Sequence, residues 1–180
     1  MKITILCVGK IKEKFYRDAI AEYEKRLSRY CKLEIIEVAD EKTPDNASEV
    51  VELQIKEKEA ERMEKYLKDG AFVCALAIDG KQLDSVELSE KIEKLGTGGT
   101  SHIIFMIGGS LGMSDELLKK ADMKLSFSRM TFPHQLMRVI LLEQVRTIDK
   151  VRLKEKVCHL DRDVLERIDK ALCVSLALDT

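Results

Sequence analysis

Hydrophobic and polar residues follow two alternating patterns along the first 150 residues. Short, nearly continuous apolar runs predict strands at residues 3–8, 33–38, 72–78, 102–107 and 124–128. Longer segments with apolar residues at helical spacing predict helices at residues 13–29, 49–67, 85–95, 114–120 and 134–149. Because strands and helices alternate, the sequence predicts an α/β fold with a parallel sheet that is covered on both faces.

Three of these segments give more specific expectations. The apolar stripe of the first helix consists of Phe15, Ile20, Tyr23 and Leu27. The helix at residues 49–67 is so rich in charged side chains that much of it should face water. The helix at residues 134–149 is apolar on all sides, which predicts burial, either in the core of one chain or also in a contact between two copies. The dipeptide Asp79-Gly80 predicts a plain turn.

The composition excludes several classes of protein. The chain has 180 residues and a formal net charge of -1, so it is not a strongly basic protein that coats DNA. Its apolar run at residues 71–78 is far shorter than the roughly 20 residues that a membrane-spanning helix needs, and we expect no membrane partner. The five cysteines include no Cys-x-x-Cys pair, which favours buried free thiols in a reducing cytoplasm over disulfides or a metal site.

Ligands of parallel α/β sheets bind at the carboxyl ends of the strands, which here means after residues 78, 107 and 125. The segment after residue 107 reads Gly-Gly-Ser-Leu-Gly, so a ligand could approach its backbone closely. Free N–H groups at the start of the next helix, which Ser114 is expected to cap, could hold an anion or a carboxylate. Taken alone, the segment is more typical of a tight turn between a strand and a helix.

The segment at residues 125–138 combines hydroxyl groups and aromatic rings with Pro133 at the entry to a helix. An apolar pocket edged by Ser, Thr and backbone groups would suit an uncharged heterocycle such as adenine. Alternatively, Pro133 and His134 simply begin and cap the helix. Residues taken alone do not decide between the two interpretations.

A basic cluster follows the first predicted strand and consists of Lys10, Lys12, Lys14 and Arg17, with Lys25, Arg26, Arg29 and Lys32 further along. These side chains could contact the phosphates of a nucleic acid. The simpler interpretation is a solvated helix face, because Glu13, Glu22 and Glu24 dilute the positive charge.

Five segments together resemble one family, namely residues 1–14, 21–27, 76–81, 107–112 and 126–135. The chain over residues 1–145 resembles the RlmH family, the small SPOUT-class methyltransferases of large-subunit ribosomal RNA. The string Thr-Phe-Pro-His-Gln-x-Met-Arg at residues 131–138, together with the Gly-Gly turn, is the most specific part of the match.

The resemblance implies a SPOUT-type parallel sheet with a C-terminal trefoil knot, an obligate homodimer, and bound S-adenosylmethionine. It implies methyl transfer to N3 of a pseudouridine in 23S rRNA of the ribosome. The cofactor-binding residues carried over from it are Leu76, Gly108, Phe127, Ser128, Arg129, Met130, Thr131 and Phe132. Because N3 must lose a proton, a base or a polarising group is needed, and His134 and Arg138 are the candidates by position.

The C-terminal part departs from this pattern. Where the family continues with Tyr-Arg-Ala and a tail rich in Tyr and His, the chain has Arg-Thr-Ile-Asp-Lys at residues 146–150. Residues 141–180 resemble instead the C-terminal part of MazF-type toxins, without the part that carries their catalytic residues. The stripe Leu160, Val164, Ile168, Leu172 and Leu176 predicts an extra amphipathic helix.

We therefore expect a methyltransferase domain at residues 1–145 and an atypical C-terminal appendage at residues 146–180, joined by a fusion at the string Leu-Leu-Glu-Gln-Val. Two alternatives to an active methyltransferase follow from the appendage. The first is a protein that binds the cofactor but is impaired in catalysis. The second is an interaction module that acts through the MazF-like tail.

Overall fold

The computed structural model describes the backbone of residues 1–152 and the side chains of residues 1–146. The predicted helix at residues 160–176 and nearly all of the expected appendage lie outside the described residues. The strands are β1 (Lys2–Val8), β2 (Lys32–Val38), β3 (Phe72–Gln82), β4 (His102–Ile107) and β5 (Met123–Ser126). The helices are α1 (Lys14–Leu27), α2 (Glu49–Glu64), α3 (Ser85–Thr97), α4 (Asp115–Lys119) and α5 (His134–Arg152).

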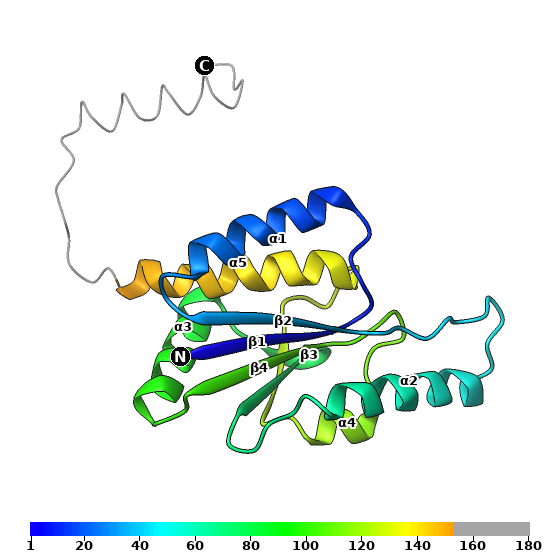
Figure 1. The fold of residues 1–180 in the computed structure, drawn as a ribbon. Coiled ribbons are helices and arrows are strands. Elements are labelled where there is room, and N and C mark those ends of the chain that lie inside the picture. The colour runs from blue at the N-terminus through cyan, green and yellow to red at the C-terminus, as the bar shows by residue number, and fades with distance from the viewer. Residues whose placement is uncertain (153–180) are drawn as a thin grey trace.

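The five strands form one sheet in the order β2-β1-β4-β3-β5, and every pair of neighbours is parallel. Helices α1, α3 and α5 cover one face, while α2 and α4 cover the other (Figure 1). The predicted α/β class and parallel sheet are therefore confirmed. The trefoil knot that the resemblance implies stays a prediction.

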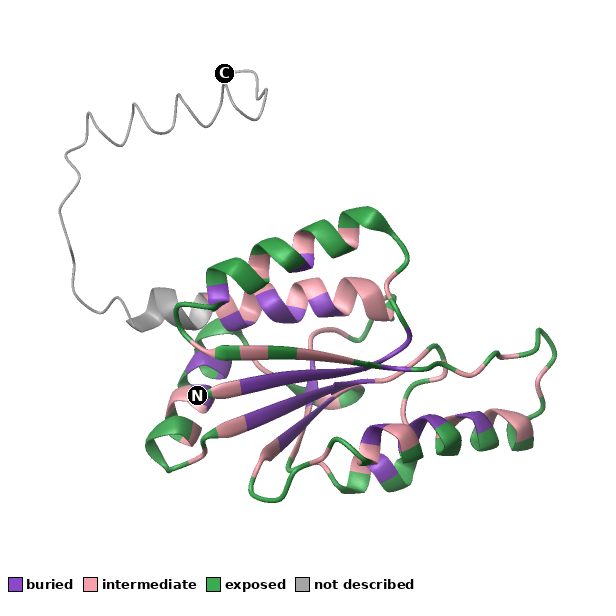
Figure 2. Cartoon of the chain, viewed as in Figure 1, coloured by how far each residue is buried: buried purple, intermediate pink, exposed green. Residues whose placement is uncertain are grey.

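The central strands are buried on both faces because the side chains of a strand alternate between them. In β1, Ile3, Ile5 and Cys7 pack into the cluster beneath α1, α3 and α5, while Leu6 and Val8 pack against α2 and α4. Figure 2 shows buried residues concentrated along the middle of the sheet and exposed residues on the outer sides of the helices. Among the described cysteines, Cys7 and Cys74 are buried free thiols, and burial raises the pKa of each to about 12.

Strand β3 contains an irregularity where the sequence predicts a plain turn. Leu76 and Lys81 both pair with Leu125 of β5, so the residues between them leave the ladder and return to it. A Cβ atom added to Gly80 would lie 2.7 Å from the backbone carbon of Leu125. The prediction of a plain turn at Asp79-Gly80 is therefore wrong. Both residues belong to β3, whose backbone passes closely over β5.

The helices also correct two predictions. Phe15 does not join the apolar stripe of α1 and is 65% exposed, because it stands five residues before Ile20, more than one turn of the helix. The prediction that much of the charged helix α2 faces water is confirmed, although one of its charged residues, Glu59, is buried. Helix α5 is only partly buried: Leu141 and Leu142 lie in the core, whereas Leu136 is half-buried.

Within the described residues, none of the helices has the length and apolar character needed to cross a membrane.

Candidate functional site

A cavity of about 770 Å³ lies at the carboxyl end of the sheet. Its walls come from the ends of β3, β4 and β5, the turn at residues 107–112 and the loop that leads into α5. These are the three strand ends at which the sequence places a ligand. No Asp, Glu, Lys or Arg is among the side chains that line the cavity within the described residues, so its walls are apolar surface, backbone, hydroxyl groups, the His134 ring and the Gln135 amide.

The glycines after β4 bring two stretches of backbone together. A Cβ atom on Gly108 would lie 2.7 Å from the carbonyl carbon of Gly112, so no larger residue fits without a shift. Gly112 has a φ of 83°, and its N–H donates to the Gly109 carbonyl at 3.1 Å. Helix α4 then begins with the predicted cap, in which the Ser114 hydroxyl accepts a hydrogen bond from the Leu117 N–H. The segment is therefore both a tight turn and a wall of the cavity.

The loop between β5 and α5 forms the opposite wall. The Ser126 hydroxyl donates to the Ser128 carbonyl at 3.0 Å, and the Ser128 hydroxyl accepts from the Met130 N–H at 3.0 Å. These bonds fold the loop back on itself, so that its backbone and rings edge the cavity. Seven of the eight residues expected to bind the cofactor line the cavity: Leu76, Gly108, Phe127, Ser128, Met130, Thr131 and Phe132. Arg129 is exposed and is not part of the lining.

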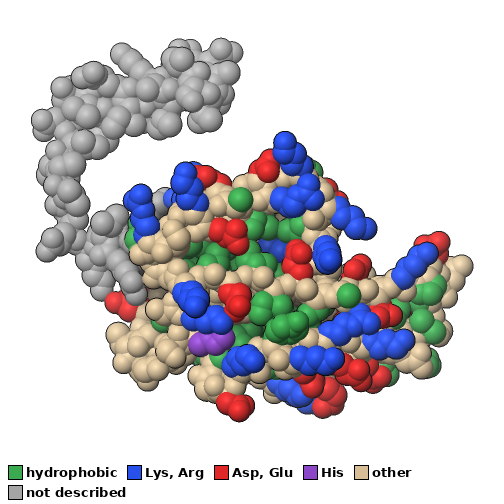
Figure 3. Space-filling view, in the orientation of Figure 1, with side chains coloured by type: hydrophobic (Ala, Val, Ile, Leu, Met, Phe, Trp, Pro, Cys, Tyr) green, Lys and Arg blue, Asp and Glu red, His purple; other side chains and the backbone are tan. Residues whose placement is uncertain are grey.

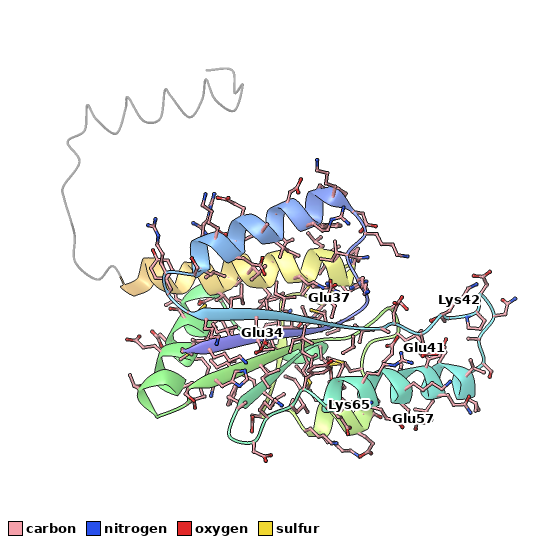
Figure 4. The ribbon with its side chains drawn as sticks, in the orientation of Figure 1. Glu34, Glu37, Glu41, Lys42, Glu57 and Lys65 are labelled. Carbon is pink, nitrogen blue, oxygen red and sulfur yellow. The ribbon has the colours of Figure 1, made fainter. Side chains whose placement is uncertain are left out.

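Arg138 is fully buried on α5 and joins three elements. Its guanidinium forms an ion pair with Glu37 of β2. Figure 4 labels Glu37 beside the ends at which α1 and α5 begin. The guanidinium also donates to the carbonyl of Val8, the last residue of β1, at 3.1 Å and to that of Gly9, the next residue, at 2.5 Å. These partners hold the start of α5 against the carboxyl ends of β1 and β2. Arg138 thus lies behind the cavity and does not line it.

His134 lines the cavity and contacts Arg138. Its Nδ1 lies 3.1 Å from the Arg138 guanidinium, and because a guanidinium can only donate, Nδ1 accepts. The neutral ring therefore carries its proton on Nε2. Burial and the positive charge of Arg138 both lower the pKa of His134, which favours that neutral ring. In this arrangement His134 can donate a hydrogen bond through Nε2 and has no free lone pair.

Glu59 is a residue that the sequence analysis did not single out. It reaches from α2 to the underside of the glycine turn, where a Cβ atom on Gly109 would lie 2.9 Å from its Oε2. Its Oε1 accepts from the Glu41 N–H at 2.9 Å, while its Oε2 is buried without a partner among the described residues. Burial raises its pKa. The signal was available, since Ile55, Glu59 and Met63 stand four residues apart on one face of α2.

A second, larger depression of about 1360 Å³ lies at the opposite end of the sheet, where the strands begin. It is lined by the beginnings of β1 and β2 and the ends of α1 and α3. We place the functional site at the smaller cavity because the carboxyl ends of β3, β4 and β5, the glycine turn and the loop that leads into α5 meet there. Among the described residues, no three His, Cys, Asp or Glu side chains come close enough together to hold a metal ion.

A family model described as "Predicted SPOUT methyltransferase" matches residues 1–152. The chain belongs to the SPOUT methyltransferase family. Over 155 residues, it is 64% identical to Ribosomal RNA large subunit methyltransferase H of Bifidobacterium adolescentis, an alignment that covers 86% of the chain and 98% of that relative. The enzymes of the same name from Bifidobacterium animalis and Clostridium novyi are 59% and 58% identical, each over the same shares of the two chains.

The resemblance to the RlmH family drawn from the motifs is thus confirmed. The family match reaches residue 152, seven residues beyond the boundary of residue 145 expected for the methyltransferase domain. The division into two parts at that boundary stays a prediction.

Proposed function

We propose that the chain methylates N3 of a pseudouridine in 23S rRNA of the large ribosomal subunit, with S-adenosylmethionine as the methyl donor. The observation that carries the proposal is the cavity at the ends of β3, β4 and β5, in a chain that is 64% identical to a large-subunit rRNA methyltransferase. We place the reaction in the cytoplasm, where the ribosomes of such relatives are found.

The lining of the cavity fits this cofactor. A volume of about 770 Å³ is within the usual range for small-molecule sites. The rings of Phe127 and Phe132 and the side chain of Leu76 offer apolar surface to an uncharged adenine, and backbone and hydroxyl groups can satisfy its nitrogens. A Cβ atom on Gly108 would collide with the backbone of Gly112, so glycine at this position allows the turn to close and keeps this wall of the cavity in place.

When bound, S-adenosylmethionine supplies a methyl group that is already activated by the positive sulfur. The protein therefore has to hold the donor and the acceptor nitrogen in line, which is a positioning effect. The bound cofactor would supply the methyl group and leave as the neutral thioether, and N3 would give up its proton to solvent or to a base. Neutral His134 can polarise the base through its Nε2–H, while Arg138 fixes the position of that ring.

A homodimer is part of the proposal. Leu136 and Ile140 are half-buried on α5 and belong to neither hydrophobic cluster of the described residues. Contact with a second copy would cover this apolar surface. Because α5 begins at the cavity, such a contact would place the partner close to the site.

Three measurements test the proposal. Isothermal titration calorimetry of the full chain with S-adenosylhomocysteine should give a single site per chain, and multi-angle light scattering should give twice the chain mass. Ribosomes that lack the modification, incubated with labelled S-adenosylmethionine, should then gain label in 23S rRNA. Binding without transfer would favour the catalytically impaired alternative, and absence of binding at saturating cofactor would overturn the proposal.

A further inference from the structure

The segment that follows β1 begins beside His134, a residue that lines the cavity. Gly9 has a φ of 82°, and a Cβ atom there would lie 2.9 Å from the His134 ring, which lines the cavity. Two residues later, the Ile11 N–H donates to Glu37, the partner of Arg138. The chain from Lys10 to Arg17 therefore starts next to the cavity and is fixed to Glu37, the carboxylate that also pairs with Arg138.

This segment carries positive charge that no ion pair neutralises. Lys10, Lys12, Lys14 and Arg17 are all exposed, and none pairs with a carboxylate among the described residues. Figure 3 shows Lys and Arg side chains gathered over the end of α1 at which the helix begins. These eight residues carry four unpaired cations against one carboxylate, Glu13, and this excess of positive charge suits a partner with closely spaced negative charges, such as the phosphates of RNA.

Two aromatic rings stand among these cations. Phe15 is 65% exposed, and the centroid of its ring lies 4.2 Å from that of Tyr16. A phenylalanine in water forgoes about 1.5–3 kcal/mol of burial, so exposure of Phe15 has a cost that the fold of one chain does not recover. An exposed ring among basic side chains is the arrangement on which proteins stack the unpaired bases of RNA.

We propose that Lys10, Lys12, Lys14, Phe15, Tyr16 and Arg17 form a surface that binds single-stranded RNA next to the target base. Phe15 stacks on an unpaired base, and the four cations contact the neighbouring phosphates. The inference rests on the proposed function and extends it, because it names the part of the chain that holds the RNA while the cavity holds the cofactor. It also explains why an overall charge of -1 is compatible with an RNA substrate.

The test measures binding of the full chain to a fluorescein-labelled single-stranded RNA of 20 uridines at several salt concentrations. Phe15→Leu keeps an apolar side chain but removes the ring, and should weaken binding roughly 5- to 150-fold. Phe15→Tyr should bind as tightly as the wild type. The triple variant Lys10→Gln, Lys12→Gln, Lys14→Gln should lower the slope of log affinity against log salt by about 2.

Matched controls come from α2 and the segment after it. Leu53→Ala changes another exposed apolar residue, and Lys58→Gln, Lys65→Gln, Lys68→Gln removes three other exposed cations. Neither should change RNA affinity more than about twofold, since solvated charges away from the strand contribute little. If the control triple variant weakens binding as much as the test variant does, the affinity is non-specific and the inference is wrong.

Calorimetry with S-adenosylhomocysteine separates this inference from the proposed function. Every variant should bind that ligand like the wild type. If the wild type binds it and the Phe15 and lysine variants still bind RNA normally, this surface is not the RNA site, although the cavity keeps its role. If the variants instead become monomeric in light scattering, the surface is a contact between two copies, which also overturns the inference.

Discussion

Arg138 allows the sharpest test of the structure, because it is a buried charge whose partners are all known. The substitution Arg138→Met keeps an unbranched, apolar side chain in the core and removes the guanidinium. Two carbonyls, those of Val8 and Gly9, then lose a donor while they remain buried. Glu37 loses the cation with which it pairs.

The size of the effect follows from these losses. Each unsatisfied buried carbonyl costs at least about 1 kcal/mol. Breaking a fully buried ion pair costs about 3–5 kcal/mol, but the Glu37 side chain is 32% exposed, so solvent screening reduces this part to about 1–2 kcal/mol. We therefore expect Arg138→Met to lower the free energy of unfolding by about 3–4 kcal/mol.

Urea denaturation followed by far-ultraviolet circular dichroism measures this change, and it suits a chain without tryptophan. The control is Arg26→Met, which removes a half-exposed pair with Glu22 on α1 and should cost no more than about 0.5 kcal/mol. Both variants are compared at one protein concentration, since the stability of a dimer depends on it. If Arg138→Met unfolds like the wild type but no longer transfers methyl groups, Arg138 acts in the reaction and our account of it as a structural tie is refuted.

Two substitutions and one titration test the structure further. Gly108→Ala should weaken S-adenosylhomocysteine binding at least about tenfold in calorimetry, because the new Cβ would lie 2.7 Å from Gly112; unchanged affinity would exclude this wall as a binding surface. Burial raises the pKa of Glu59 above its ordinary value of 4.5, so the free energy of unfolding of the wild type should fall as the pH rises through this raised pKa. Glu59→Gln should remove the loss. If the wild type and the variant show the same pH dependence of stability from pH 4.5 to 8, this expectation is contradicted. Burial and the charge of Arg138 hold the pKa of His134 below 6.5, so the stability that its neutral ring contributes is present above pH 6.5 and is lost as the pH falls through the lowered pKa. Titration of the His134 ring protons by NMR with a midpoint at or above 6.5 would disprove the neutral ring.

The sequence predicts most of the fold because its apolar periods are strong and its loops are short. Within residues 1–152, all five strands and five helices stand where the pattern places them, with ends that shift by a few residues. The cavity was also foreseen, since the rule of strand ends needs only the order of the elements. The ion pair that holds the start of α5 against the sheet could not be predicted from the sequence. Arg138 and Glu37 lie 101 residues apart in the chain, and no local pattern indicates such a pair.

Two residues show why local patterns fail at a site. Glu59 is a charged residue in a charged helix, and only its place in line with Ile55 and Met63 indicates that it turns inward. Phe15 is apolar at the start of an amphipathic helix, yet it points to solvent because the stripe of α1 passes to one side of it. In both cases the type of residue suggested one environment and its angular position on the helix decided another.

The edges of the sheet limit how two copies can associate. β2 forms one edge and carries the exposed charged residues Lys32, Glu34 and Glu37, while β5, at the other edge, has only four residues. Charged or very short edge strands discourage another chain from extending the ladder. If two copies associate, we therefore expect them to meet through helices and loops. No sheet would then continue from one copy into the next, which protects the protein from growing into fibres.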